Sequence, residues 1–206
     1  MFNDYLEKFF RFGAKILARV LYSCEFEGFH NIPKTGAAIV IANHVSYVDG
    51  LVLNAASKRP MRFIIDADIY NTAGVNYFMK LDRAIPVSPT KDSVKKMLET
   101  VKEALDNGEL IAIFPEGMIT YTGNLNRFKF GIEWILQNNN VPVIPVALIG
   151  LWGSIFSRKY LDSKHKFLPR YFRKKVKVIC GKPIPHSKAK IQYMQRELMK
   201  LISENI

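Results

Sequence analysis

The order of apolar and polar residues predicts short strands that alternate with helices. Residues 37–42 form a continuous apolar run, which is typical of a strand buried on both faces. Shorter apolar runs predict further strands at residues 62–65, 84–87, 110–114, 143–148 and 175–179. Pro86 and Pro145 interrupt two of these runs, so we expect those strands to lie at a sheet edge or to carry a bulge.

Three other segments repeat their apolar residues at the helical spacing of three and four, namely residues 5–22, 93–105 and 191–202. Strands alternating with helices predict an α/β fold, with a central, largely parallel or mixed sheet flanked by helices. No internal repeat or Gly/Ser-rich linker interrupts the 206 residues. We therefore expect one compact domain at residues 27–206, preceded by a docking helix within residues 1–26.

That first helix is amphipathic, and its partner is expected to be a membrane surface. The whole chain has 30 basic and 18 acidic side chains, so its surface attracts polyanions. A helix packed entirely onto its own domain would show the same periodicity, and that alternative stays open. The apolar face carries Leu6, Phe9, Phe10, Ile16, Leu17, Val20 and Leu21, and the basic stripe carries Lys8, Arg11, Lys15 and Arg19.

The compartment is expected to be the cytoplasmic face of the inner (plasma) membrane, with peripheral attachment. Charged residues interrupt every possible apolar core of a secretory signal near the N-terminus. No run of 18 uncharged apolar residues exists, so membrane contact must be interfacial. Cys24 and Cys180 are too few to indicate a disulfide framework or a zinc site.

The polar residues with the clearest chemistry follow the strand at residues 37–42. His44 and Asp49 are five residues apart, which would place them about 140° apart on a helix and on opposite faces of a strand. They can meet only if the chain changes from loop to helix between them, and Ser46-x-x-Asp49 is a helix-start signal. Asp49 would then orient His44 as a general base. On this segment alone, Asp49 as a plain capping acid and His44 as a strand-ending polar residue remain equally open.

A second candidate is Glu116, in the turn Phe114-Pro115-Glu116-Gly117 that ends another predicted strand. Adjacent parallel strands end at the same sheet edge, so we expect Glu116 near His44. Its carboxylate can accept hydrogen bonds from substrate hydroxyls, and Gly117 permits close approach of a ligand. Taken alone, Pro-Glu-Gly is also an ordinary surface turn.

Four blocks in order resemble the glycerolipid acyltransferase family typified by 1-acyl-glycerol-3-phosphate acyltransferase. They are Asn43-His44-x-x-x-x-Asp49, Phe114-Pro115-Glu116-Gly117, Gly123-x-Leu125-x-x-Phe128-Lys129-x-Gly131 and the apolar run at residues 141–146. The resemblance covers residues 27–150. It implies a glycerol-3-phosphate acyltransferase-like fold and direct acyl transfer from acyl-CoA or acyl carrier protein to a lysophospholipid hydroxyl. By that match His44 is the base and Asp49 orients it, and no metal or cofactor is needed.

The resemblance also implies an acceptor site that includes Asn43, Glu116 and Gly117. In many family members, an apolar run that corresponds to residues 84–87 is followed within a few residues by an Arg that binds phosphate. Here the run continues into Ser88-Pro89-Thr90-Lys91, so that Arg is missing. Arg83, Arg127 and Lys129 are the candidates to bind the phosphate in its place. The Pro-x-x-Pro-Thr pattern at residues 86–90 and the segment 149–154 look more like the acyltransferase units that occur fused to transporter-like and acyl-carrier-protein synthetase domains. Those units are similar to enzymes that reacylate lysophosphatidylethanolamine.

Residues 158–177 interleave basic and aromatic side chains, a pattern that suits an anionic lipid surface or single-stranded nucleic acid. Given the four blocks, we expect lipid headgroups or an acidic acyl carrier and no nucleic acid. Two alternatives to the acyltransferase remain. One is a serine-type lipid esterase built on Ser46, although the Gly-x-Ser-x-Gly elbow is absent. The other is a non-catalytic basic membrane-binding module.

Overall fold

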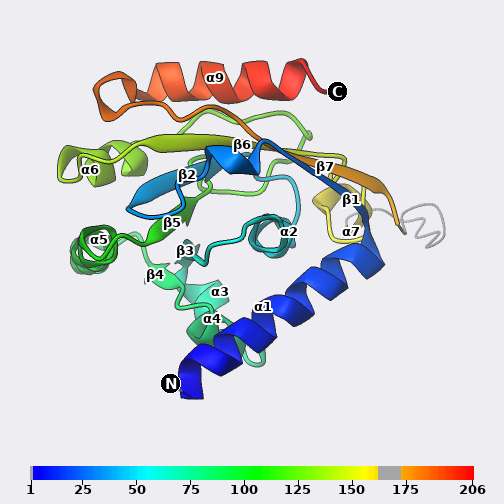
Figure 1. Ribbon diagram of the computed structural model, residues 1–206, viewed down its shortest axis with the longest axis horizontal. Coiled ribbons are helices and arrows are strands. Elements are labelled where there is room, and N and C mark those ends of the chain that lie inside the picture. The colour runs from blue at the N-terminus through cyan, green and yellow to red at the C-terminus, as the bar shows by residue number, and fades with distance from the viewer. Residues whose placement is uncertain (1, 162–172) are drawn as a thin grey trace.

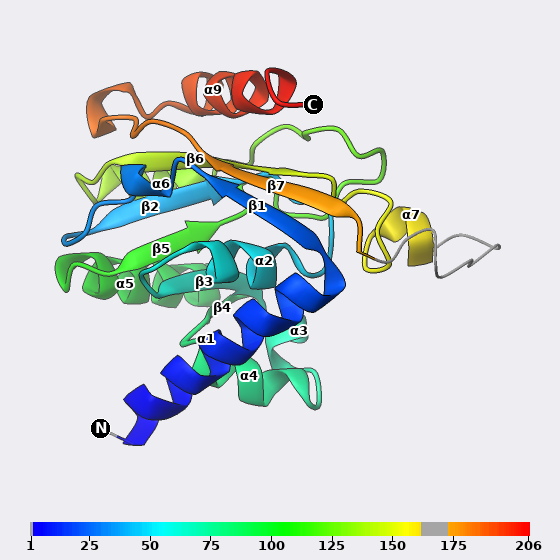
Figure 2. The same cartoon turned by 45° about the vertical axis from the view of Figure 1, so that its right-hand side comes forward.

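The computed structural model describes residues 2–161 and 173–206, and it confirms an α/β fold built around a mixed sheet (Figures 1 and 2). Within these residues the sheet has seven strands in the order β1-β7-β6-β2-β5-β3-β4. Neighbouring strands of this described sheet pair in parallel, except that β6 and β7 are antiparallel. The strands are β1 (Ser23–Glu27), β2 (Ala38–Ala42), β3 (Met61–Asp66), β4 (Ile85–Val87), β5 (Leu110–Ile113), β6 (Val143–Ile149) and β7 (Lys175–Cys180).

Helices cover both faces of the sheet. Helices α1 and α2 lie on one face, and α5, α6 and α9 lie on the other (Figure 1). The three helices predicted from periodicity are confirmed as α1, α5 and α9. The helices are α1 (Phe2–Leu21), α2 (Asp49–Ala56), α3 (Ala67–Asn71), α4 (Val75–Leu81), α5 (Lys91–Asp106), α6 (Gly131–Gln137), α7 (Arg158–Leu161) and α9 (Ile191–Ser203), with short 3₁₀ turns at Phe29–Asn31 and His186–Lys188.

Strand β2 lies at the centre of the sheet, and all five of its residues are buried. Val40 packs into the cluster under α1 and α2, whereas Ile39 and Ile41 pack into the cluster under α5, α6 and α9. Burying each such side chain contributes about 1.5–3 kcal/mol. The strand is apolar without alternation because both of its faces are covered, and it holds the following loop in place.

Strand β1 was not predicted, and it spans Ser23–Glu27, across the expected boundary between residues 26 and 27. Its side chains alternate between exposed and half-buried, and its sequence includes Glu25 and Glu27. It pairs with β7 through five residues, from Ser23 with Lys175 to Glu27 with Ile179. Residues 23–27 therefore belong to the sheet, and α1 leads directly into it.

The two prolines behave differently. Pro86 lies in the edge strand β4, as predicted. Pro145 lies in β6, a central strand, so an edge position was wrong for it. In β6, Val143 bridges Ile184 and Val146 pairs with Cys180. Two residues lie between these positions in β6, whereas three residues lie between Cys180 and Ile184 in the facing segment. Pro145 thus occupies an interruption of the ladder, and its carbonyl accepts from the backbone of Gly181.

Helix α1 has a packed face and an exposed apolar face. Its small residues Ala14 and Ala18 are buried, and α1 packs against α2. Residues two positions apart differ by about 200° around a helix, so Ile16 and Val20 point away from Ala18. Phe9 is 76% exposed, and the exposed set comprises Phe9, Phe12, Ile16, Leu17 and Val20. The alternative of a helix packed entirely onto its own domain is therefore wrong.

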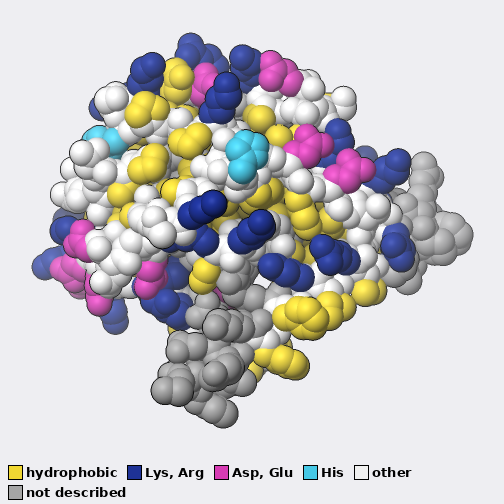
Figure 3. Space-filling view, in the orientation of Figure 1, with side chains coloured by type: hydrophobic (Ala, Val, Ile, Leu, Met, Phe, Trp, Pro, Cys, Tyr) yellow, Lys and Arg dark blue, Asp and Glu magenta, His cyan; other side chains and the backbone are white. Residues whose placement is uncertain are grey.

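Figure 3 shows basic side chains gathered beside exposed hydrophobic ones over α1. Lys15 and Arg19 belong to this helix. Some predicted positions lie outside the described residues: the side chains of Leu6, Lys8, Phe10 and Arg11, and the basic and aromatic residues within 162–172. Among the helices that are described, none is long and apolar enough to cross a membrane.

Candidate active site

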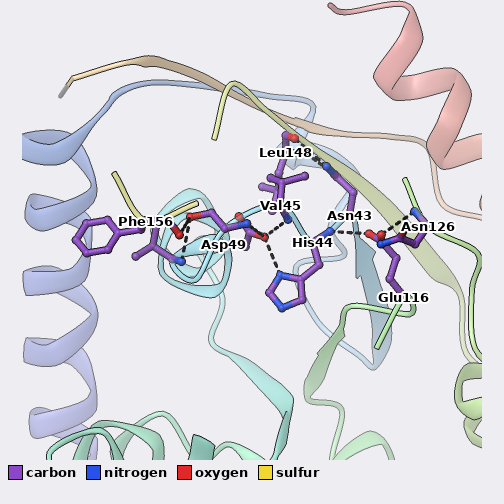
Figure 4. Close-up of polar contacts among 10 residues, drawn as sticks. Asn43, His44, Val45, Asp49, Glu116, Asn126, Leu148 and Phe156 are labelled. Carbon is purple, nitrogen blue, oxygen red and sulfur yellow. Dashed lines mark hydrogen bonds and ion pairs between the residues drawn. The ribbon is translucent and has the colours of Figure 1, made fainter. Parts of the chain in front are cut away.

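His44 and Asp49 meet in the loop between β2 and α2. The strand ends at Ala42 and the helix begins at Asp49, so the chain makes the change from loop to helix that their spacing requires. Nδ1 of His44 lies 2.8 Å from Oδ2 of Asp49 (Figure 4). The predicted contact between the two side chains is present.

Asp49 is fully buried and holds the loop as well as the imidazole. Its Oδ2 also accepts hydrogen bonds from the backbone N–H groups of Val45, at 2.6 Å, and Ser46, at 2.9 Å. Burial raises the pKa of Asp49, while the hydrogen bonds from His44 and the backbone lower it. Because Oδ2 accepts from two fixed N–H donors, it is an acceptor toward His44 too. Nδ1 then carries the proton, and Nε2 is the basic nitrogen.

The imidazole is fixed by stacking. It lies on the Phe114 ring with centroids 4.2 Å apart and planes 14° apart, and Phe63 lies beyond Phe114. The His44 side chain remains 21% exposed. Among the described residues, no protein group hydrogen-bonds Nε2. A solvent-accessible, oriented imidazole nitrogen is suited to accept a proton from a hydroxyl.

Glu116 lies at the same sheet edge as His44, as predicted, but its carboxylate contacts the protein. It is 1% exposed, and its two oxygens accept the backbone N–H groups of His44 and Asn126, each at 2.7 Å (Figure 4). Burial raises its pKa, and these hydrogen bonds lower it. A contact between Glu116 and the acceptor stays a prediction. In this geometry the residue ties the end of β2 to the loop after β5.

Asn43 is likewise occupied by the backbone. Its Nδ2 donates to the Leu148 carbonyl at 2.9 Å, and its Oδ1 accepts the Leu148 N–H at 2.7 Å. This pair joins the ends of β2 and β6. Gly117 is exposed with φ of 67°, and a Cβ there would lie 3.2 Å from Cγ of Lys129. The side chains of Arg127 and Lys129 are exposed on this same loop.

Arg83 is a predicted site residue that the structure does not bring together with His44. It precedes β4 and forms an ion pair with Glu109, which precedes β5. His44 follows β2, and β2 runs parallel to β5. Arg83 therefore lies at the amino ends of the strands and His44 at the carboxyl ends, which are opposite edges of the sheet.

Ser46 is placed as a structural residue. Its side chain is buried, and its Oγ donates to the Phe156 carbonyl at 3.0 Å. It makes no hydrogen bond to the His44 ring, so the nucleophile–base contact of a serine esterase is missing. Sequence reasoning did not find the supports supplied by Leu148 and Phe156. Both act through backbone groups, the carbonyl and N–H of Leu148 and the carbonyl of Phe156, which leave no side-chain signal.

The chain matches the Acyltransferase family over residues 23–149, which include His44 and Asp49, together called the dyad, and the Glu116 turn. It belongs to that family. It is 27% identical over 201 residues to a chloroplastic 1-acyl-sn-glycerol-3-phosphate acyltransferase of Arabidopsis thaliana, covering 93% of this chain and 53% of the relative. It is also 28% identical over 181 residues to a probable 1-acyl-sn-glycerol-3-phosphate acyltransferase of Mycoplasma genitalium, covering 84% of this chain and 66% of the relative.

The fold of this chain is similar to that of the 1-acyl-sn-glycerophosphate acyltransferase of Thermotoga maritima. The TM-score is 0.76 at 21% identity, with 98% of this chain and 78% of the other covered. The chain spans about half the length of the plant relatives that it matches. Among the described residues, no group of three or more His, Cys, Asp or Glu side chains is placed to hold a metal ion.

Proposed function

We propose that this acyltransferase moves a fatty acyl group from an acyl thioester to the hydroxyl of a lysophospholipid. The observation that carries the proposal is the imidazole of His44, held by Asp49 at Nδ1 and open at Nε2. The acceptor named in the relatives is 1-acylglycerol 3-phosphate. Lysophosphatidylethanolamine is a second candidate acceptor, and either acyl-CoA or acyl carrier protein can supply the thioester.

In the proposed reaction, Nε2 of His44 takes the proton of the acceptor hydroxyl as its oxygen attacks the thioester carbonyl carbon. The new C–O bond forms, the C–S bond breaks, and the departing thiolate takes the proton back from Nε2. Asp49 stabilises the imidazolium that exists between these steps. A positioned general base of this kind contributes about 10²–10⁴ in rate.

The test is a turnover assay of the purified chain. It offers lysophosphatidic acid, lysophosphatidylethanolamine and glycerol 3-phosphate, each with acyl-CoA and with acyl carrier protein. His44→Ala should abolish turnover while the circular dichroism spectrum and Tm stay close to wild type, because the backbone groups of residue 44 keep their partners. Retention of more than about a tenth of the activity would contradict the base mechanism.

We also propose that α1 docks the enzyme on the cytoplasmic face of the inner membrane. Its exposed apolar residues lie opposite the face that packs on α2, so they can enter a lipid interface without unpacking the domain. Lys15 and Arg19 lie on the same helix, and a basic side chain near an anionic surface contributes about 1 kcal/mol. Acceptor lipid would then reach His44 without leaving the membrane.

Point substitutions test docking better than truncation, because removing α1 would also remove Ala18 from the core and uncover α2. The double variant Phe9→Ser, Phe12→Ser should lose sedimentation with anionic vesicles and keep its Tm. Met199→Ser is the matched control, since Met199 is exposed on α9 across the sheet. Unchanged vesicle binding by the double variant would place the membrane contact elsewhere.

A further inference from the structure

A group of basic side chains lies at the carboxyl end of β6, beside the loop that carries the dyad. Arg158 begins α7, and its guanidinium carbon lies 4.1 Å from the ring centroid of Tyr121. Tyr121 follows Thr120, whose N–H donates to the His44 carbonyl. Two residues before Arg158, the Phe156 carbonyl accepts from the 46–47 segment of the dyad loop. Arg158 is therefore supported from two sides, each within two residues of a contact with that loop.

Two lysines join Arg158. Lys174 Nζ donates to the Trp152 carbonyl at 3.2 Å. A Cβ built on Gly153 would lie 3.4 Å from Nζ of Lys174 and 3.7 Å from Cδ of Lys159, so both side chains converge on one glycine. Burial and the charge of Lys159 lower the pKa of Lys174. We call Arg158, Lys159 and Lys174 the β6 basic cluster.

This cluster has no acidic partner in the part of the chain that the structure describes. None of its members forms an ion pair there, and Nε of Arg158 is buried without a hydrogen-bond partner. Gathering three cations without a counter-charge is unfavourable, and a bound anion would relieve it. The Arg158 guanidinium is held over the Tyr121 ring, and a guanidinium can bind two phosphate oxygens at once through its N–H groups.

We propose that the β6 basic cluster binds the phosphate group of the lysophospholipid acceptor. This rests on the proposed function, which brings the acceptor hydroxyl to His44 and its phosphate close by. The cluster lies at the same sheet edge as the dyad, whereas Arg83 lies at the opposite edge. Coenzyme A also carries phosphates, so the experiment must separate the acceptor from the donor as the source.

The experiment measures kcat and KM of Arg158→Gln and Lys159→Gln for lysophosphatidic acid, with acyl-CoA and then acyl carrier protein as saturating donor. Loss of one charge-assisted contact should raise acceptor KM about tenfold or more for Arg158→Gln. Lys159 is exposed, so its variant carries little folding risk. Inhibition by glycerol 3-phosphate, competitive with the acceptor, should weaken in parallel.

The matched control is Arg196→Gln. Arg196 also stacks on a tyrosine, with its guanidinium carbon 5.0 Å from the ring centroid of Tyr193, but it lies on α9. The substitution Arg196→Gln removes the same charge and the same kind of contact with a tyrosine ring, and acceptor KM should stay at the wild-type value. A KM rise of equal size in this control would overturn the assignment, because it would report a general loss of positive charge.

Four further outcomes would overturn the inference. A rise in donor KM confined to acyl-CoA, with acceptor KM unchanged, would assign the cluster to the coenzyme A phosphates. A lower Tm and kcat with unchanged acceptor KM in Arg158→Gln and Lys159→Gln would assign it a purely structural role. A wild-type enzyme that acylates no lysophospholipid would overturn the proposed function and this inference with it, whereas normal turnover with unaltered variants would overturn the inference alone.

Discussion

Replacing Glu116 by Gln separates a structural role of this carboxylate from a direct role in acceptor binding. Both oxygens of Glu116 accept backbone N–H groups, one from His44 and one from Asn126. The amide of Gln has only one oxygen. Whichever way it turns, its NH₂ group faces a second N–H donor in a buried site. The variant therefore loses one charge-assisted hydrogen bond and leaves a backbone donor unsatisfied.

The magnitude follows from those two changes. A hydrogen bond to a charged group contributes about 1.5–3 kcal/mol, and a buried unsatisfied donor costs about 1–3 kcal/mol. Burial raises the pKa of Glu116 because a charged carboxylate is costly to desolvate. Gln carries no charge and costs less to desolvate, which offsets part of this loss. We expect the free energy of unfolding to fall by about 2–4 kcal/mol, which lowers Tm by about 5–10 °C in a chain of this size.

The assay is thermal unfolding together with steady-state kinetics. kcat should fall because the His44 backbone loses its anchor, while donor and acceptor KM change little. Glu109→Gln is the matched control, since Glu109 pairs with Arg62 and Arg83 at the opposite edge of the sheet and should cost less than about 1 kcal/mol. A Tm within about 2 °C of wild type, together with a selective rise in acceptor KM, would refute this reasoning and restore direct acceptor binding.

Four other predictions concern the same loops. Asp49→Asn should lower kcat by about 10²–10⁴ and the free energy of unfolding by about 1–3 kcal/mol. The amide oxygen can keep the contacts of Oδ2, but the NH₂ group then takes the buried Oδ1 position, which has no partner among the described residues; an unchanged kcat would contradict the prediction. Burial raises the pKa of Asp49, so the folded wild type is stabilised by the protonated form, and this stabilisation is lost as pH rises from about 4 through the folded-state pKa. The Asn side chain of the variant does not titrate. The free energy of unfolding of Asp49→Asn relative to wild type, measured by urea titration, should therefore increase over that pH range. Ser46→Ala should keep most of its activity, whereas a serine nucleophile would lose all of it, and a serine-reactive phosphonate should leave the wild type active. Gly123→Ala should lower Tm, because its Cβ would lie 2.6 Å from the Trp152 ring at a φ of 88°.

Most of the sheet and the contact between His44 and Asp49 could be predicted from the sequence alone. Strands β2, β5 and β6 are buried on both faces, so their apolar runs are continuous and easily recognised. The five-residue spacing of His44 and Asp49 required the change from loop to helix that α2 makes at Asp49. Strand β1 was not predicted from the sequence, because its position at the exposed edge of the sheet allows charged residues to alternate with half-buried ones. Local periodicity reports burial, and β1 is only partly buried.

Tertiary structure decided which distant residues meet. Glu116 reaches the His44 backbone because β2 and β5 are neighbours in the sheet. Arg83 lies at the other end of the strands because it precedes its strand, whereas His44 follows one. The contact of Arg158 with the Tyr121 ring joins residues 37 positions apart in the chain, and no local pattern specifies such a contact. Helix periodicity showed that α1 is amphipathic, but only the packing of Ala18 on α2 showed that its large apolar side chains face outward. The physical reason is the same in each case: spacing along the chain sets the direction of a side chain, and the order of the strands sets what it meets.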